Sequence, residues 1–211
     1  MNAATQALAL QGAAGTIEAL LDLPADGAVR GTAVIAHPHP LFGGTMTNKV
    51  VQTLARACVQ TGWRAVRFNF RGVGASAGAY DEGRGEAADM LGVVRQLAPE
   101  GPLAIAGFSF GAFVASHVVR QLGARAPEKI VLVGTAASRF PVEPIAPELH
   151  ARTLVLHGEQ DDTVALSSVL DWARPQHLPV TVIPGVEHFF HGQLPLLKSL
   201  VVRHLLSPGD L

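Results

Sequence analysis

The chain has 211 residues, a length that predicts one domain, spanning residues 1–211, with a full hydrophobic core. Hydrophobic residues make up 48% of the sequence and charged residues only 16%, which excludes an intrinsically disordered protein. The formal net charge is −1 and no cluster of lysine or arginine occurs, so neither a nucleic acid nor an anionic membrane is expected as a partner.

The predicted elements alternate along the chain. Residues 7–10 and 16–23 are β-like runs that predict an N-terminal hairpin. Continuous apolar runs predict further strands at residues 31–37, 63–70, 103–107, 129–135, 153–157 and 179–183. Apolar residues at helical spacing predict helices at residues 47–60, 86–97, 112–122, 167–173 and 194–206. Because the strands are apolar throughout, we expect an α/β fold with a mostly parallel sheet covered by helices on both faces.

The segment around Ser109 carries the clearest motif. Gly107-Phe108-Ser109-Phe110-Gly111 fits the pattern G-x-S-x-G and lies directly between a predicted strand and a predicted helix. A serine at such a turn is held in a strained backbone conformation, and small residues are needed beside it. Its hydroxyl then stands above a helix N-terminus, whose dipole favours developing negative charge. The segment therefore predicts Ser109 as a nucleophile at a strand-to-helix elbow.

A second match to the same pattern occurs around Ser76, at residues 74–78. The strand before it ends at Phe70, so Ser76 lies well inside a loop, and the residues that follow do not form an apolar helix. Context therefore favours Ser109 over Ser76. The alternative for Ser109 is a buried serine in a glycine-rich packing turn.

An acid and a histidine follow two later strands. Reactive groups of a parallel sheet lie beyond the carboxyl ends of its strands. Asp161 and Asp162 follow the strand at 153–157, and His188 follows the strand at 179–183, whereas no acid follows the strand at 129–135. The chain order Ser, Asp, His is the one expected when the serine is on a G-x-S-x-G elbow.

Five segments in this order carry a family resemblance: HPHPLFGG, NFRGVGASAG, GFSFG, HGEQDDTV and GVEHFFHG, within residues 37–192. They resemble the α/β-hydrolase superfamily, in particular its small, dienelactone-hydrolase-like members. The resemblance implies an eight-stranded, mostly parallel sheet with one antiparallel strand near the start. It also implies ester or related acyl chemistry without a metal or an organic cofactor. Dienelactone hydrolases use a cysteine nucleophile, so the serine here does not carry over dienelactone activity.

On this interpretation Ser109 attacks an acyl carbonyl and His188 is the general base, because it follows the last strand. His191 is the rival base, although it lies where the closing helix would begin. Asp161 matches the acid of the family pattern H-G-x-x-D-x-x-V and would orient the imidazole. Asp162 is the alternative acid, with a solvated turn carboxylate as its expected role.

The oxyanion hole needs two preorganised N–H groups. Phe110, the residue after the nucleophile, should supply one. The second should come from the loop after the strand at 31–37, where Pro38 and Pro40 lack an N–H. His39 and Leu41 remain, and the resemblance to the family loop favours Leu41.

Aromatic residues near these loops predict an apolar pocket: Phe42, Tyr80, Phe108, Phe110, Phe140, Phe189 and Phe190. The connection at residues 136–152 is too short for a lid domain, so we expect an open site and small acyl substrates. The leading prediction is a carboxylesterase-like serine hydrolase. A thioesterase or an acyltransferase, a peptidase, and a binding protein that kept the fold are the alternatives.

Other features predict no further chemistry. The pairs His37/His39 and His188/His191 lack a third ligand at suitable spacing, so no metal site is expected. Cys58, the single cysteine, lies on the apolar face of a predicted helix and is expected in the core. No lysine or arginine precedes Arg30 and no apolar run reaches membrane-spanning length, which predicts a cytoplasmic protein. The sequence leaves the oligomeric state open.

Overall fold

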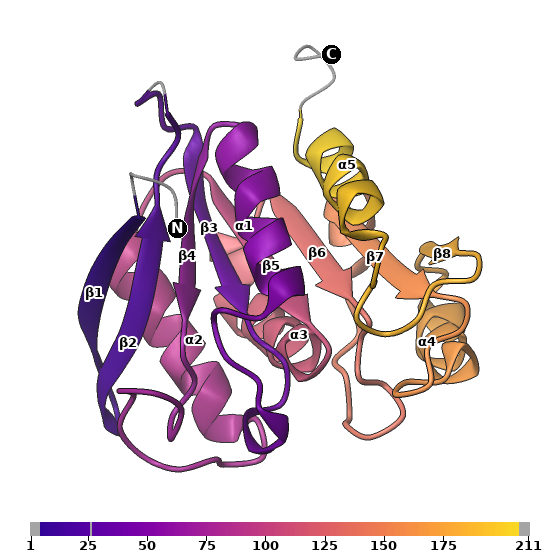
Figure 1. Cartoon of the computed structure of the whole chain (residues 1–211), viewed down its shortest axis with the longest axis horizontal. Helices are drawn as coiled ribbons and strands as arrows, with labels where there is room; N and C mark the ends of the chain where they lie inside the picture. Colours follow the sequence, from indigo (N-terminus) through magenta and orange to yellow (C-terminus); the bar gives the residue numbers. More distant parts are fainter. Residues whose placement is uncertain (1–4, 26, 207–211) are drawn as a thin grey trace.

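A computed structural model of the chain describes residues 5–25 and 27–206, and places eight strands in one sheet in the order β1-β2-β4-β3-β5-β6-β7-β8 (Figure 1). The strands are β1 (Thr5–Gly12), β2 (Gly15–Asp22), β3 (Gly31–Ala36), β4 (Trp63–Phe68), β5 (Leu103–Phe108), β6 (Lys129–Val133), β7 (Thr153–Gly158) and β8 (Val180–Ile183). The helices are α1 (Lys49–Gln60), α2 (Arg84–Leu97), α3 (Phe110–Leu122), α4 (Leu166–Ala173) and α5 (Leu194–Leu205). The predicted fold class is confirmed, and the predicted elements are all present with ends shifted by a few residues.

The strand directions confirm the expected arrangement. Strands β3, β4, β5, β6, β7 and β8 pair in parallel, whereas β2 pairs antiparallel with both β1 and β4. Among the eight strands described, β2 is thus the one that runs against the others. The hairpin of β1 and β2 extends one edge of a parallel sheet.

Both faces of the sheet are covered by helices, which explains the continuous apolar strands. Figure 1 shows α1 and α5 on one side of the sheet and α2 and α3 on the other. On β3, Val34 packs into the core under α2 and α3, while its neighbours Ala33 and Ile35 pack into the core under α1 and α5. Successive side chains of a strand point to opposite faces, so both sets must be apolar.

Cys58 lies in the core between α1 and the sheet and is 2% exposed. Burial raises the pKa of its thiol to about 12, so the group stays protonated at neutral pH. This confirms its prediction as a small core residue. Among the residues that the structure describes, no helix combines the length and the apolar character needed to cross a membrane.

Candidate active site

The turn between β5 and α3 holds Ser109 in a left-handed backbone conformation, with φ 57° and ψ −117°. This region is costly for a residue with a side chain and persists only where the surrounding structure holds it. The Ser109 amide donates a hydrogen bond of 2.8 Å to the carbonyl oxygen of Val133 on β6. Helix α3 begins at the next residue, Phe110. The serine therefore stands at the strand-to-helix elbow that the sequence predicts.

Two glycines make this turn possible. A Cβ atom on Gly107 would lie 2.2 Å from the carbonyl oxygen of Gly111, and a Cβ atom on Gly111 would lie 2.4 Å from the carbonyl oxygen of Ala36. Real Cβ atoms do not approach backbone so closely. The small residues of the motif are thus required where α3 crosses the ends of β5 and β3.

Three predicted side chains meet beside this turn. His188 Nε2 lies 3.0 Å from Ser109 Oγ, and His188 Nδ1 lies 2.6 Å from Asp161 Oδ2. His188 follows β8 and Asp161 follows β7, so the carboxyl ends of three strands deliver the group. The short contact to a carboxylate assigns the proton to Nδ1, which leaves Nε2 free to accept from the serine hydroxyl. All three residues are buried, with His188 only 1% exposed.

The segment after β6 makes room for the imidazole instead of supplying an acid. Gly134 has a φ of 53°, and a Cβ atom there would lie 3.1 Å from His188 Cε1. The Phe108 ring also packs against the imidazole, with ring centroids 4.9 Å apart. A larger residue at position 134 would therefore displace His188 from the serine.

Asp161, and not its neighbour, faces the histidine. Its Oδ1 accepts hydrogen bonds from the amides of Val164 (2.7 Å) and Thr163 (3.0 Å), which leaves Oδ2 for His188. Burial alone would raise the pKa of Asp161, but the hydrogen bonds from His188 and the Val164 amide outweigh it and hold the pKa below its ordinary value. Asp162 is exposed and contacts the Thr163 hydroxyl.

His157, near the end of β7, is a buried polar residue for which the sequence predicts no role. Its Nε2 lies 2.9 Å from the Val164 carbonyl oxygen and 3.5 Å from Asp161 Oδ2. Burial lowers its pKa, so the ring is neutral and donates from Nε2. It therefore ties the turn that carries Asp161 to β7. The sequence feature that could have identified this residue is its position as the first residue of the HGEQDDTV segment.

The two rivals from the sequence lie elsewhere. His191 is exposed and pairs with Glu187 at 3.1 Å, and it is not among the residues that line the cleft beside Ser109. Ser76 is buried in its loop, where its hydroxyl donates to the Asn69 carbonyl oxygen (2.7 Å) and accepts from the Glu18 amide (3.0 Å). The first bond ties the loop to its own start just after β4, and the second ties it to β2, which is a structural role.

The loop after β3 offers two amides for an oxyanion. The Leu41 amide already donates to Nδ1 of the His39 side chain at 3.2 Å, and the Leu41 side chain is exposed. The His39 amide has no hydrogen-bond partner among the residues that the structure describes, and His39 lines the cleft. Together with the amide of Phe110 at the start of α3, the geometry favours His39 over the predicted Leu41.

His37 holds this loop in place. Its Nδ1 lies 2.6 Å from the Pro38 carbonyl oxygen, and its Nε2 accepts a hydrogen bond of 3.0 Å from the Phe70 amide. Burial lowers the pKa of His37 to about 4, so the ring is neutral at physiological pH. Both ring nitrogens are engaged in the fold. Within the described residues, no group of three or more histidine, cysteine or acidic side chains is placed to hold a metal ion.

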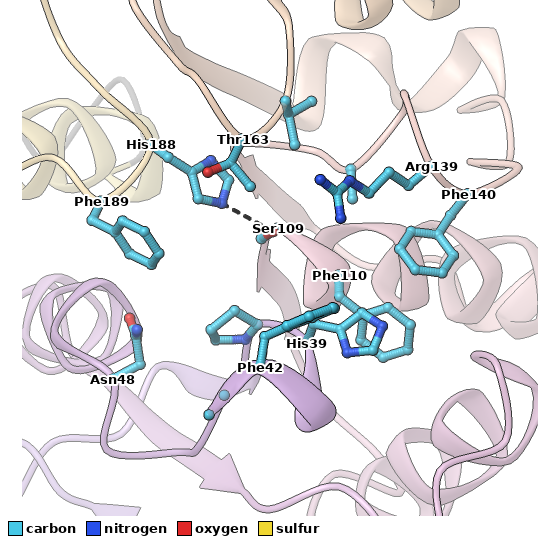
Figure 2. Close-up of a pocket in the computed structure, with 15 residues that line it drawn as sticks. His39, Phe42, Asn48, Ser109, Phe110, Arg139, Phe140, Thr163, His188 and Phe189 are labelled. Carbon is cyan, nitrogen blue, oxygen red and sulfur yellow. Dashed lines mark hydrogen bonds between the residues drawn. The ribbon is translucent and has the colours of Figure 1, made fainter.

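A cleft of about 420 Å³ opens above Ser109 (Figure 2). Four of the predicted aromatic residues line it: Phe42, Phe110, Phe140 and Phe189. The prediction is wrong for Phe108 and Phe190, which are fully buried in the core. Tyr80 is not among the lining residues and packs against the His39 ring, with centroids 4.9 Å apart. The cleft is largely apolar, with the serine hydroxyl at its floor.

Comparison with known proteins agrees with this geometry. The profile of the family described as "Thioesterase domain" matches residues 86–199, more than half of the chain. An uncharacterized protein of Rickettsia prowazekii is 34% identical over 191 residues, which are 83% of this chain and 78% of that protein.

Two solved structures are also similar over almost the whole chain. A Xanthomonas campestris protein, described as an α/β serine hydrolase without a lid, is 36% identical with a TM-score of 0.86, covering 97% of this chain and 95% of that one. An α/β serine hydrolase homologue from Coxiella burnetii is 36% identical with a TM-score of 0.80, covering 95% of this chain and 97% of that one.

The two neighbouring acids provide a matched pair of variants. We expect Asp161→Asn to lower kcat by about 10⁴-fold, because the imidazole loses the partner that fixes its tautomer and balances its charge. Asp162→Asn should change kcat by less than about tenfold, since it removes one solvated charge. The measurement is kcat on one short activated ester after circular dichroism has shown both variants folded. A crippled Asp162→Asn beside a nearly normal Asp161→Asn would mean that the acid is misassigned.

Removing the backbone N–H of Leu41 distinguishes His39 from Leu41 as the oxyanion donor. Leu41→Pro deletes the Leu41 N–H within a short 3₁₀ turn, Pro40–Phe42, that already begins with proline. If His39 is the donor, kcat should stay within about tenfold of the native value, whereas loss of an oxyanion donor costs about 10²–10³-fold. Leu41→Ala, which keeps the amide, is the control. A collapse of kcat in Leu41→Pro alone would restore Leu41 as the donor.

Proposed function

The chain belongs to the thioesterase-domain family of α/β serine hydrolases, and we propose that it hydrolyses small carboxylic esters through an acyl-enzyme intermediate on Ser109. The observation that carries the proposal is the continuous chain of contacts Ser109–His188–Asp161, with 3.0 Å and 2.6 Å between the facing atoms. Ser109, at one end of this series of contacts, lies at the floor of a cleft, where an acyl carbonyl can reach its hydroxyl.

In the first half of the reaction, Ser109 Oγ attacks the carbonyl carbon while His188 Nε2 takes the hydroxyl proton. The carbonyl oxygen becomes an oxyanion, which accepts hydrogen bonds from the amides of Phe110 and His39. His188 then returns the proton to the leaving oxygen as the ester C–O bond breaks. An alcohol departs, and the acyl group stays on Ser109 as an ester.

In the second half, a water molecule takes the place of the alcohol. His188 removes a proton from the water as its oxygen attacks the acyl carbon, and the same two amides hold the new oxyanion. When the intermediate collapses, His188 returns the proton to Ser109 Oγ and a carboxylic acid is released. Asp161 keeps Nδ1 protonated and stabilises the imidazolium in both halves.

The cleft supports small acyl substrates. The chain from β6 to β7 contains a turn and the short 3₁₀ segment Pro147–Arg152, with no inserted domain above Ser109. The lidless relative from Xanthomonas campestris supports the same open arrangement. We assign the chain to the dienelactone-hydrolase-like subtype within the family on its sequence segments, with serine in place of the cysteine nucleophile.

A thioesterase is the second candidate, and the match to the thioesterase-domain profile favours it. The acyl-enzyme and its hydrolysis would be the same. The leaving atom would be sulfur, which departs as a thiol or thiolate and depends less on proton return from His188. The rates of hydrolysis of an ester and a thioester that carry the same acyl group therefore distinguish the two candidate functions.

The identity of the nucleophile is tested with a fluorophosphonate probe, because Ser109 and Ser76 both lie in G-x-S-x-G segments. We expect modification of Ser109, whose hydroxyl faces His188, and none of Ser76, whose hydroxyl is held by the backbone. Ser109→Ala should lower kcat by about 10⁴-fold or more, and Ser76→Ala is the matched control. A mass spectrum with the adduct on Ser76 would overturn the assignment.

Substrate size is tested with activated esters of increasing acyl length. An open cleft of about 420 Å³ should favour acyl chains of roughly two to six carbons. The measurement is kcat/KM along the series, repeated with thioesters of the best acyl group. A preference for long-chain lipids, with activation at an oil–water interface, would contradict the open-site proposal.

A further inference from the structure

Arg139 is a charged side chain in a largely apolar cleft. It follows β6 and lines the same cleft as Ser109. Figure 2 shows its guanidinium end turned toward the centre of the cleft, beside Phe140. No ion pair or side-chain hydrogen bond joins it to another of the described residues. The proposed reaction gives this cation no role.

The backbone that carries Arg139 is fixed. The amides of Arg139 and Phe140 both donate to the Ala136 carbonyl oxygen, at 3.2 Å and 3.1 Å. The Phe140 ring stacks on Phe113 with centroids 4.9 Å apart and meets Phe110 edge-on at 5.1 Å. The base of the arginine is therefore anchored to the start of α3, the helix that also positions Ser109.

No acid in the cleft neutralises this cation. The described residues that line it include no aspartate or glutamate, and the other titratable members are the imidazoles of His39 and His188. Burial first, and the positive charge of Arg139 second, lower the pKa of His39. Among the described residues that line the cleft, the guanidinium is thus the permanently charged group, and an anion that entered would meet no like charge on this lining.

The positions of the catalytic groups indicate which part of a substrate would meet Arg139. Figure 2 shows His188 and Phe189 on one side of Ser109, and Arg139 and Phe140 on the other. The leaving group must lie near His188, since His188 protonates it. The acyl group then extends away from His188, toward Arg139 and Phe140.

We infer that Arg139 binds a carboxylate at the far end of the acyl group, so that the preferred substrates are monoesters of dicarboxylic acids. The inference rests on the proposed ester hydrolysis and names its substrate class. A guanidinium matches a carboxylate in charge and in planar, two-point geometry. The apolar Phe140 ring, which lines the cleft and is only partly buried, suits the methylene chain between the two carboxyl groups.

The test compares charged and uncharged esters of equal chain length. The charged substrates are the mono-4-nitrophenyl esters of glutarate and adipate, and the uncharged ones are 4-nitrophenyl pentanoate and hexanoate, with spontaneous hydrolysis subtracted. In Arg139→Met, the ratio of kcat/KM for a charged ester to that for its uncharged partner should fall about tenfold or more. The native ratio should also fall as salt is added, because the pair is solvent-accessible.

Arg95→Met is the matched control. Arg95 is an exposed arginine on α2 that is not among the residues lining the cleft, and its loss should leave the ratio unchanged. An unchanged ratio in Arg139→Met, or an equal loss on both kinds of ester, would overturn the inference, since Arg139 would then not recognise charge.

Measuring binding in a variant that cannot turn over tests the role of Arg139 independently of the proposed hydrolysis. In Ser109→Ala, calorimetry should show that the adipate monoester binds more tightly than the hexanoate ester, and that adding Arg139→Met removes the difference. If the native protein hydrolysed neither ester, the proposed function would fail, but this binding difference would still support the role of Arg139. Equal binding of the two esters would refute that role even if both esters were hydrolysed.

Discussion

Ser109 holds a left-handed backbone conformation at the point where β5 ends and α3 begins, and the geometry of the site is set from that point. The strain costs about 1–3 kcal/mol and persists only because the surroundings fix the turn. Strand β5 lies between β3 and β6 in the sheet, and α3 packs over it through buried residues from Phe110 onward. Gly107 and Gly111 let the backbone of the turn approach its neighbours without a clash. The serine hydroxyl is thereby held clear of the sheet.

The parallel sheet then brings distant residues to this hydroxyl. His188 lies 79 positions from Ser109 in the chain, yet β7 and β8 end at the same edge as β5 and deliver Asp161 and His188 there. Burying a carboxylate costs free energy unless hydrogen bonds compensate it. The amides of Thr163 and Val164 and the imidazole of His188 supply those bonds to Asp161. The same low-polarity surroundings strengthen the interaction between Asp161 and the imidazolium that forms during the reaction.

The sequence was sufficient for the parts of the molecule that local pattern controls. Apolar runs identified the strands because both faces of the sheet are covered, and the G-x-S-x-G segment identified the elbow because only glycine fits beside it. Details that depend on tertiary packing were not predictable. The His39 side chain accepts a hydrogen bond from the Leu41 amide, and no sequence pattern predicts such a contact. Phe108 and Phe190 are buried in the core whereas Phe42 and Phe189 are exposed beside the cleft, and Arg139 reaches the cleft from a loop with no recognisable motif.

The central claim is that Ser109 becomes acylated during turnover. It is tested most directly by mixing the protein with a short activated ester, quenching in acid within milliseconds, and measuring the mass of the intact chain and of its peptides. The account predicts one acyl group per chain, on the peptide that contains Ser109, which forms and decays at rates that match turnover. Turnover without any acyl adduct on Ser109, or an adduct that forms on another residue at the rate of turnover, would contradict it.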